Sequence, residues 1–356
     1  MAFTKLQVVE TKVPTEHSNL IVLNPRIDQI FIDTFGERAY REYREAWAIG
    51  TKIEGHQKDF PIQLDFELNY SCNLRCPMCT WSSEVSKDRS CFDLEKFKEI
   101  IDEGVKKGLK AIRLNYINEP LLRPDLHHFI TYARSKGIID IMFSTNGVLL
   151  RKQEQCEELI KAGLTKIQFS VDAVTPETYA QVRVGTTLEK VHQAIDLFIS
   201  VKKQLQADLP LIRVNFVLGP HNKHEFLAFA EYWKSKDVDL IATQEYFPLD
   251  TVTQNGVKVL NFDKDGTKKS EIGRFHSFKC SIPFRQMTVR NSGEVLPCCS
   301  FYGAELVYGN VNKGETISQL WNSPQMKKMR AIHKEGNYQD NPICKKCVES
   351  HSYVLD

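Results

Sequence analysis

Strand-like and helix-like segments alternate along the chain from residue 62 onward. Apolar segments typical of strands lie at 62–68, 111–117, 139–143, 166–171, 211–218 and 239–243. Amphipathic segments at 93–107, 125–136, 151–162, 187–205 and 223–236 separate them. Strands joined by helical crossovers run parallel, because a tight hairpin would reverse the chain. The pattern therefore predicts an α/β fold with a parallel sheet and outer helices, as an open sheet or a barrel.

Two further regions flank this alternating segment. Residues 27–49 have the pattern of one amphipathic helix, which we expect to pack across one end of the main domain. Residues 249–279 are rich in Asn, Gly, Lys and Ser and are expected to be a linker or lid. We therefore divide the chain into an N-terminal extension (1–60), a main domain (61–248), this linker, and a cysteine-rich domain (280–356).

Composition excludes several classes of protein. The 356 residues are 42% hydrophobic and 26% charged, with a net charge of +2, so no strong field favours nucleic acid or membrane. No apolar run approaches the ~20 residues that span a bilayer, and the N-terminus lacks a signal-peptide pattern. The ten cysteines cluster in CxxC-type spacings, which indicates reduced thiols that bind metal in the cytoplasm.

Three of these cysteines follow the first predicted strand. Cys72, Cys76 and Cys79 lie in Tyr70-Ser-Cys-Asn-Leu-Arg-Cys-Pro-Met-Cys-Thr80, at the carboxyl end of a strand, where parallel α/β sheets bind ligands. Three thiolates can bind three irons of a cubane cluster and leave the fourth iron open. A zinc site, with His56 as the nearest further ligand, and purely structural thiols are the alternatives.

The CxxxCxxC spacing with Asn-Leu inside it resembles the signature of the radical S-adenosylmethionine (radical SAM) superfamily. The resemblance implies an open six-stranded partial TIM barrel and a 4Fe-4S cluster. Its fourth iron would chelate the amino and carboxylate groups of the methionine moiety of S-adenosylmethionine. Met78 stands where the family usually has an aromatic residue, and we expect its apolar side chain to pack near the adenine.

The same resemblance assigns cofactor contacts to residues at later strand ends. Glu119 and Pro120 match the family's Gly-Gly-Glu-Pro loop, and Glu119 is expected to contact the methionine ammonium. Arg183 resembles the arginine that pairs with the methionine carboxylate; a surface arginine is the alternative. The remaining expected contacts with S-adenosylmethionine are Asn118, Ser144, Asn146, Ser170, Asp172 and, more weakly, Asn215, which could face substrate instead.

A second cysteine set lies near the C-terminus and comprises Cys280, Cys298, Cys344 and Cys347. Four thiolates also suit zinc. The spacing Cys…Gly-x4-Cys followed by CxxC resembles the twitch domain, a shortened SPASM extension, as does the segment 317–324. This resemblance implies one auxiliary 4Fe-4S cluster with all four irons bound by protein, in an electron-transfer or structural role.

Three cysteines remain outside both sets. Cys299 is an alternative cluster ligand, a buried apolar residue or a hydrogen-atom donor, and Cys91 is a second donor candidate because it lies near the strand ends. Cys156 has the position of a residue on a helix face. Neither donor role follows from the motif itself.

The resemblance implies an enzyme that cleaves S-adenosylmethionine to a 5′-deoxyadenosyl radical, which abstracts a hydrogen atom from substrate. Maturation of a ribosomally made peptide, by crosslinking, epimerisation or cleavage, is the favoured outcome. A dehydrogenase or epimerase of a sugar or aminocyclitol is the alternative. A non-catalytic iron–sulfur or zinc scaffold would leave Glu119 and Arg183 unexplained. Expected partners are the peptide or sugar-like substrate, a reductant of the flavodoxin or ferredoxin type, and optionally a peptide-recognition protein docked on residues 1–60.

Overall fold

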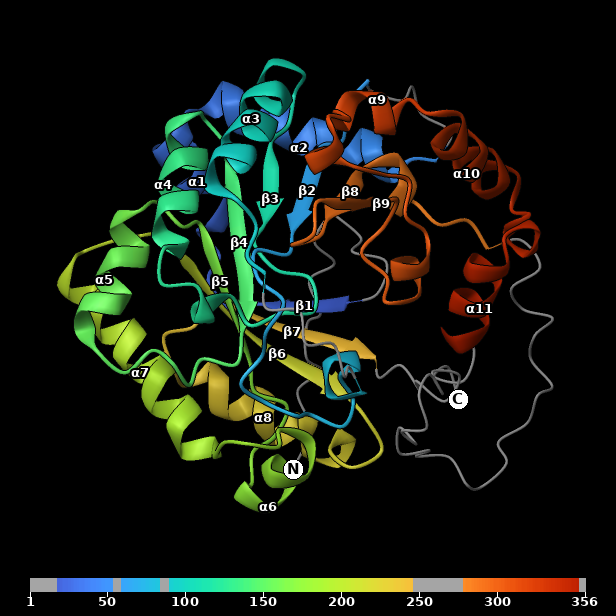
Figure 1. The fold of residues 1–356 in the computed structure, drawn as a ribbon. Helices are drawn as coiled ribbons and strands as arrows, with labels where there is room; N and C mark the ends of the chain where they lie inside the picture. Colours follow the sequence, from blue (N-terminus) through green and yellow to red (C-terminus); the bar gives the residue numbers. More distant parts are fainter. Residues whose placement is uncertain (1–17, 54–58, 84–89, 246–277, 352–356) are drawn as a thin grey trace.

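The computed structural model describes residues 18–53, 59–83, 90–245 and 278–351. Within these residues the strands form a ten-stranded sheet in the order β1-β7-β6-β5-β4-β3-β2-β8-β9-β10 (Figure 1). Its central strands pair in parallel, as predicted. They are β2 (Gln63–Phe66), β3 (Ala111–Arg113), β4 (Asp140–Thr145), β5 (Lys166–Ser170), β6 (Leu211–Leu218) and β7 (Leu240–Glu245). The two edges of the sheet do not meet, so the α/β fold is an open partial barrel.

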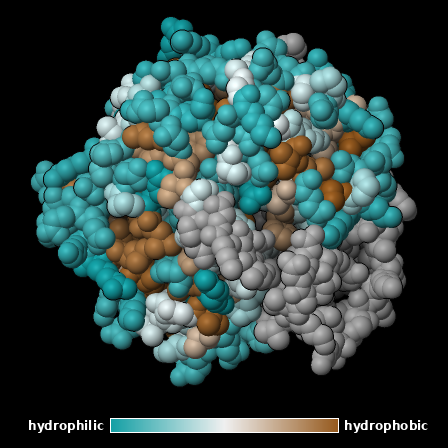
Figure 2. Space-filling model, viewed as in Figure 1, coloured by the Kyte–Doolittle hydropathy of each residue, from teal (hydrophilic) through white to brown (hydrophobic). Residues whose placement is uncertain are grey.

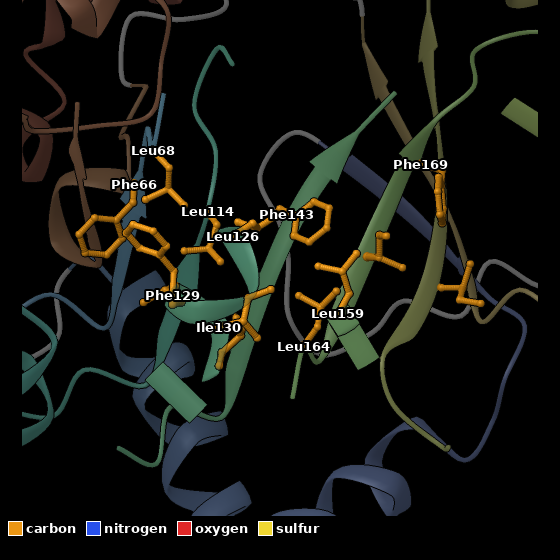
Figure 3. Packing of buried hydrophobic residues seen from close by; sticks show 14 of the residues in the cluster. Phe66, Leu68, Leu114, Leu126, Phe129, Ile130, Phe143, Leu159, Leu164 and Phe169 are labelled. Atoms are coloured by element: carbon orange, nitrogen blue, oxygen red, sulfur yellow. The ribbon is translucent and has the colours of Figure 1, made fainter. Parts of the chain in front are cut away.

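The crossover helices cover the outer face of this sheet (Figure 1). They are α3 (Leu94–Lys106), α4 (Leu126–Ser135), α5 (Gln153–Lys161), α7 (Leu188–Gln204) and α8 (Phe226–Lys234). The Asp93 carboxylate accepts a bond from the Lys96 N–H and so caps the N-terminus of α3. Figure 3 shows the core between the layers, where strand residues such as Phe66, Phe143 and Phe169 pack with helix residues such as Phe129, Ile130 and Leu159.

The predicted single helix over 27–49 is wrong, because two helices occupy this region. α1 (Ile27–Phe35) ends at Gly36, whose φ of 85° lies in the left-handed region, and α2 (Glu37–Thr51) begins directly after it. Buried side chains of α1 and α2 pack with the first residues of the parallel strands. The pair thus closes the amino-terminal end of the barrel, as expected of this region. That cluster comprises Ile30, Phe31, Tyr40, Tyr43, Ala111, Ile139, Leu211 and Leu240.

Two elements were not predicted, one in the N-terminal extension and one in the main domain. β1 (Ser18–Val22) pairs antiparallel with β7 and forms one edge of the sheet. α6 (Pro176–Val182) begins with a Thr175 side-chain cap in the connection after β5. Short 3-10 helices also occupy η1 (Thr80–Ser83), η2 (Pro120–Leu122) and η3 (Lys223–Glu225).

The cysteine-rich domain continues the barrel sheet. β8 (Gln286–Val289) pairs in parallel with β2, so the C-terminal segment extends the edge of the barrel. β9 (Glu294–Leu296) and β10 (Gly309–Asn310) follow in antiparallel pairing. The remaining elements are η5 (Ile282–Phe284), η6 (Tyr302–Glu305), η7 (Val311–Lys313), α9 (Ile317–Trp321), α10 (Pro324–Glu335), η8 (Tyr338–Asp340) and α11 (Pro342–His351). The predicted linker lies outside the described residues except for 278 and 279.

The surface in Figure 2 is mainly hydrophilic, with separate small hydrophobic areas. Large exposed apolar side chains are scattered through the described sequence, for example Ile49, Val184, Leu227 and Val307. None of the described helices is both long enough and apolar enough to cross a bilayer.

Candidate functional site

The three cysteines after β2 lie together in one loop. Cys76 is buried, and Cys72 and Cys79 are half-buried. The Cys79 N–H donates to the Cys76 carbonyl at 2.9 Å, and the Leu74 N–H donates to Cys72 Sγ at 3.5 Å. Burial, with smaller contributions from the charges of Glu119, Cys79 and Cys76, raises the pKa of Cys72 to about 12. Thiolates here would be costly unless a cationic group lay among them.

This loop is anchored to the ends of later elements. The Arg75 N–H donates to the Val184 carbonyl at 2.9 Å, and its guanidinium donates to the Cys72 carbonyl at 2.9 Å. The Asn146 side chain donates to Asn73 Oδ1 at 2.8 Å. The cysteine loop is therefore fixed to the segments that follow β4 and α6.

Arg183 and Asp172 form a buried ion pair beside the loop. Arg183 Nε donates to Asp172 Oδ2 at 2.5 Å, and Arg183 Nη1 lies 3.7 Å from Cys76 Sγ. Asp172 has a left-handed φ of 64°, and its other oxygen accepts a bond from the Val217 N–H at 2.6 Å. Only 14% of the Arg183 side chain is exposed, so the alternative of a surface arginine is wrong. The two residues predicted to contact S-adenosylmethionine thus hold each other at the cysteine loop.

Glu119 lies buried at the centre of the strand ends. Its Oε1 accepts bonds from Thr145 Oγ1 at 2.7 Å and from the Leu121 N–H at 3.1 Å. Its Oε2 accepts a bond from the Asn146 N–H at 2.9 Å. The carboxylate therefore ties the loop after β3 to the end of β4, and Oε2 keeps a lone pair for a further donor. Burial raises its pKa, and these hydrogen bonds oppose the shift.

The other predicted contacts divide into two groups. The Asn118 amide bonds to Asn69 Oδ1 at 2.7 Å and Pro120 begins η2, so both shape the loop around Glu119. Ser144 and Ser170 are half-buried. Their neighbours on the strands belong to the outer core, so alternation directs the two hydroxyls to the inner face of the barrel.

Met78 lines a pocket beside the cysteine loop. The other walls of this pocket include Pro77, Val217, Gly219 and His221. An apolar side chain thus borders a cavity next to the three thiols, as expected of a residue that packs near an adenine. Its role as such a contact remains a prediction.

The second cysteine set comes together from three segments. Cys298 follows β9, Cys344 and Cys347 lie on α11, and Cys280 precedes η5. Burial raises the pKa of Cys298 well above its usual value, and the charges of Cys280 and Cys347 add to this shift. Cys347 Sγ also lies 3.2 Å from Ser300 Oγ. All four predicted ligands therefore share one region.

His333 was not identified in the sequence, yet its ring lies between two of these cysteines. The Cys280 N–H donates to His333 Nδ1 at 3.4 Å, and His333 Nε2 lies 3.4 Å from Cys344 Sγ. Burial lowers the pKa of His333 to about 4. Its position on helix α10 gave no sequence signal, because His333 is separate from the cysteine motifs.

The two donor candidates have different surroundings. Cys299 interacts electrostatically with Asp65, Arg113 and Arg285, whereas its neighbour Cys298 interacts with Cys299 itself and with Cys280 and Cys347 of the second set. Burial raises the pKa of Cys299 to about 11. Cys91 is exposed, and its backbone forms an isolated antiparallel β-bridge with Asn69. Cys156 is buried on α5, as its position predicted.

The donor sets suit iron–sulfur clusters. Cysteine thiolates are the usual cluster ligands, and each set is buried enough to need a compensating cation. Within the described ranges, no three His, Cys, Asp or Glu side chains are close enough to hold one metal ion. Each thiolate of a cubane binds a different iron, so such thiolates lie farther apart than the ligands of one ion.

The inner face of the barrel is unusually polar, and Asn215 on it was identified from the sequence, whereas its charged residues were missed. Asp65, Arg113, Gln168, Arg213 and Asn215 alternate along their strands with residues of the outer core. Arg113 and Arg213 remain half-buried in the middle of the sheet, whereas the residues next to them along the strands are fully buried. Charged residues at every second position of a central strand were the signal that could have identified this face.

A parallel partial barrel with clustered thiols at its strand ends defines an iron–sulfur protein of the α/β class. The family model for the radical SAM superfamily matches residues 66–232, and the model for an iron–sulfur cluster-binding domain, SPASM, matches 280–348. Residues 66–232 therefore belong to the radical SAM superfamily, and residues 280–348 form a SPASM domain. Domains of these two kinds imply 4Fe-4S clusters and S-adenosylmethionine as cofactors.

Curated relatives match about half of the chain. A probable GTP 3′,8-cyclase of Methanococcus maripaludis is 26% identical over 56% of this chain and 64% of its own length. The GTP 3′,8-cyclase of Alkaliphilus oremlandii is 30% identical over 52% of this chain and 56% of its own length. The chain therefore spans less than two thirds of these relatives.

Solved structures share the fold over more of the chain. BtrN in complex with AdoMet and 2-DOIA has a TM-score of 0.50 and 18% identity, covering 80% of this chain and 91% of its own. Streptococcus suis SuiB has a TM-score of 0.54 and 15% identity over 82% and 72%. The anSMEcpe protein with bound AdoMet has a TM-score of 0.56 and 14% identity over 77% and 81%. At these identities the likeness concerns the fold.

Proposed function

We propose that this protein reductively cleaves S-adenosylmethionine and abstracts a hydrogen atom from a substrate in the barrel. The observation that carries this proposal is the meeting of the cysteine loop, Glu119 and the Arg183–Asp172 pair at one end of the sheet. Cys72, Cys76 and Cys79 would hold a 4Fe-4S cluster, which when reduced would supply the one electron that this cleavage needs. The chain's own residues position the reactants and exclude water.

The proposed roles follow the positions of the side chains. Cys72, Cys76 and Cys79 hold the site cluster, and Cys280, Cys298, Cys344 and Cys347 hold the auxiliary cluster. Glu119 orients the methionine ammonium through the free lone pair of Oε2, and Arg183, held beside the loop by Asp172, pairs with the methionine carboxylate. The inward hydroxyls of Ser144 and Ser170 are placed to meet the ribose, and Met78 borders the adenine.

For the substrate, the first candidate is a ribosomally made peptide that the enzyme crosslinks, epimerises or cleaves. A structure of anSMEcpe with bound AdoMet and the Cp18Cys peptide shares this fold, with a TM-score of 0.53. That likeness supports a barrel mouth of suitable architecture. Crosslinking and cleavage would change the mass of the peptide, and epimerisation would add one deuterium in deuterated solvent, so mass spectrometry detects each product.

A second candidate is a compact polar molecule, such as a sugar or aminocyclitol that is oxidised or epimerised. The specific observation in its favour is the polar inner face, where Arg113, Gln168 and Arg213 offer unused hydrogen-bonding atoms. A long apolar peptide side chain would leave these atoms without partners, at a cost of about 1–3 kcal/mol each.

Anaerobic turnover with a chemical reductant tests the proposal. The reconstituted protein should form 5′-deoxyadenosine only when both S-adenosylmethionine and reductant are present, and Cys72→Ala should form none. Retained cleavage in Cys72→Ala would exclude the site assignment. Turnover in deuterated solvent with candidate substrates then separates outcomes: solvent deuterium in the product indicates epimerisation, and its absence indicates oxidation or crosslinking.

A further inference from the structure

The inner face of the barrel carries more positive than negative charge at the level of Arg113 and Arg213. Asp65 interacts electrostatically with Arg113, and its oxygens accept bonds from Gln63 at 2.5 Å and Gln286 at 3.2 Å. Asp140 Oδ2 accepts a bond from Lys166 Nζ at 2.6 Å, whereas its Oδ1 has no hydrogen-bond partner among the described residues. These two carboxylates are fewer than the three cations Arg113, Lys166 and Arg213.

Arg213 has no protein partner among the described residues. Its guanidinium makes none of the hydrogen bonds or ion pairs found there, and its buried Nε lacks an acceptor. Arg113 Nε is buried and lacks an acceptor in the same way. Burial, together with the positive charge of Arg113, lowers the pKa of Arg213 to about 9, and the charge of Asp140 opposes this shift. Two buried guanidiniums that make no direct ion pair with a carboxylate of the described residues cost stability.

The register of the sheet places this pair directly below the cofactor residues. Arg213 pairs with Gln168, and two positions further along the same strands Asn215 pairs with Ser170. Ser170 ends β5 and is followed by Asp172 at the proposed S-adenosylmethionine site. Gln168 Oε1 and Asn215 Oδ1 are also buried without partners. The pair therefore lies one layer deeper in the barrel than the proposed cofactor, facing the space where a substrate would lie.

We propose that Arg113 and Arg213 form an anion-binding site that holds a phosphate or carboxylate group of the substrate. The identification of the bound anion as part of a substrate rests on the proposed function. The anion site itself depends only on the residues of the barrel. A tetrahedral or planar anion would accept bonds from both guanidiniums and neutralise their charges. Binding of this anion by Arg113 and Arg213 would fix one end of the substrate, so that its other end lies beside the proposed cofactor residues.

Calorimetric titration of the reconstituted protein tests this site, with S-adenosylmethionine present and reductant absent. The probes are pyrophosphate, inorganic phosphate and malonate at constant ionic strength. We expect one equivalent of at least one probe to bind, and Arg213→Gln to weaken its binding about 10- to 100-fold, since a charged hydrogen bond is lost. Arg213→Lys should bind with intermediate affinity. Arg38→Gln, which removes an exposed arginine, should bind as the unchanged protein does.

The two kinds of probe identify the source of the anion. Preference for the phosphate probes indicates a phosphorylated substrate, and preference for malonate indicates a carboxylate such as that of an acidic peptide residue. Either preference supports the site. Failure of all three probes to bind, or equal binding by Arg213→Gln, would overturn it.

Thermal unfolding without added anion separates ligand binding from a structural role. Because Arg213→Gln removes an unpaired positive charge, its midpoint should equal or exceed that of the unchanged protein. A midpoint several degrees lower would mean that the guanidinium has a structural partner, and would overturn the proposal. Neither measurement requires cofactor cleavage. A protein that binds anions but forms no 5′-deoxyadenosine would refute the proposed function alone, and the reverse result would refute the anion site alone.

Discussion

The carboxylate of Glu119 accepts the backbone N–H of Asn146 at 2.9 Å, and through this bond the loop after β3 determines where β4 ends. Asn146 in turn donates to Asn73 inside the cysteine loop at 2.8 Å. The acidic residue expected to contact the cofactor thus also positions the loop expected to hold the cluster. Its two roles require separate measurements.

Glu119→Gln should weaken both the fold and cofactor binding. Both carboxylate oxygens accept bonds, so the amide nitrogen of glutamine would face an N–H or O–H donor. We expect a loss of about 1–3 kcal/mol, seen as a lower unfolding midpoint, and roughly tenfold weaker binding of S-adenosylmethionine. Glu154→Gln, at an exposed position of α5, is the matched control. Unchanged affinity in Glu119→Gln would assign the residue a structural role only.

Iron content distinguishes the two cysteine sets. The reconstituted protein should hold about eight irons, as two cubanes. Cys72→Ala should hold about four and form no 5′-deoxyadenosine, whereas Cys347→Ala should also hold about four but keep some cleavage. Cys156→Ala, which removes a buried thiol of α5 outside both sets, should keep about eight. Four irons together with zinc in the unchanged protein would contradict the auxiliary cluster.

The parallel sheet could be predicted because its strands and helices have different hydrophobic periods. Helix α3 shows this well, since both its apolar face and its Asp93 cap are local features. The single helix over 27–49 was predicted wrongly, because Gly36 ends α1 with a left-handed φ while the apolar pattern continues into α2. β1 was missed because an edge strand of five residues has little pattern of its own.

The spacing of the cysteines identified both motifs in the sequence. The residues that surround the motifs in the fold could not be identified in this way. Pairing of β8 with β2 joins segments more than two hundred residues apart, and no local signal encodes it. The same pairing brings Cys299 near Asp65 and Arg113. The contact of His333 with Cys280 and Cys344 depends on how α10 and α11 pack, which the sequence does not state.

Glu67 should make stability fall as pH rises through the weakly acidic range. Burial raises its pKa from 4.5 to about 7, and the charge of Arg290 opposes the shift. Between these values the folded state keeps a proton that the unfolded state releases. The stabilising contribution is therefore full below about pH 4.5 and is lost as pH rises to about 7, on the order of 3 kcal/mol. Glu67→Gln stays uncharged, so its unfolding midpoint should rise relative to that of the unchanged protein between about pH 4.5 and 7.

The matched control for that comparison is again Glu154→Gln, whose pH dependence should follow that of the unchanged protein. Parallel curves for Glu67→Gln and the unchanged protein would show that Glu67 remains ionised in the folded state throughout this range.

His333→Ala should alter the auxiliary cluster without affecting the site cluster. Nδ1 accepts the Cys280 N–H, so the ring proton lies on Nε2, which can donate to Cys344 Sγ at 3.4 Å. Hydrogen bonds to cluster sulfurs raise the reduction potential, because they stabilise the more negative reduced state. We expect the auxiliary midpoint potential to become more negative in a redox titration followed by electron paramagnetic resonance. His128→Ala, at an exposed position of α4, should leave it unchanged. An unaltered potential in His333→Ala, with full iron content, would show that the ring does not act on the cluster.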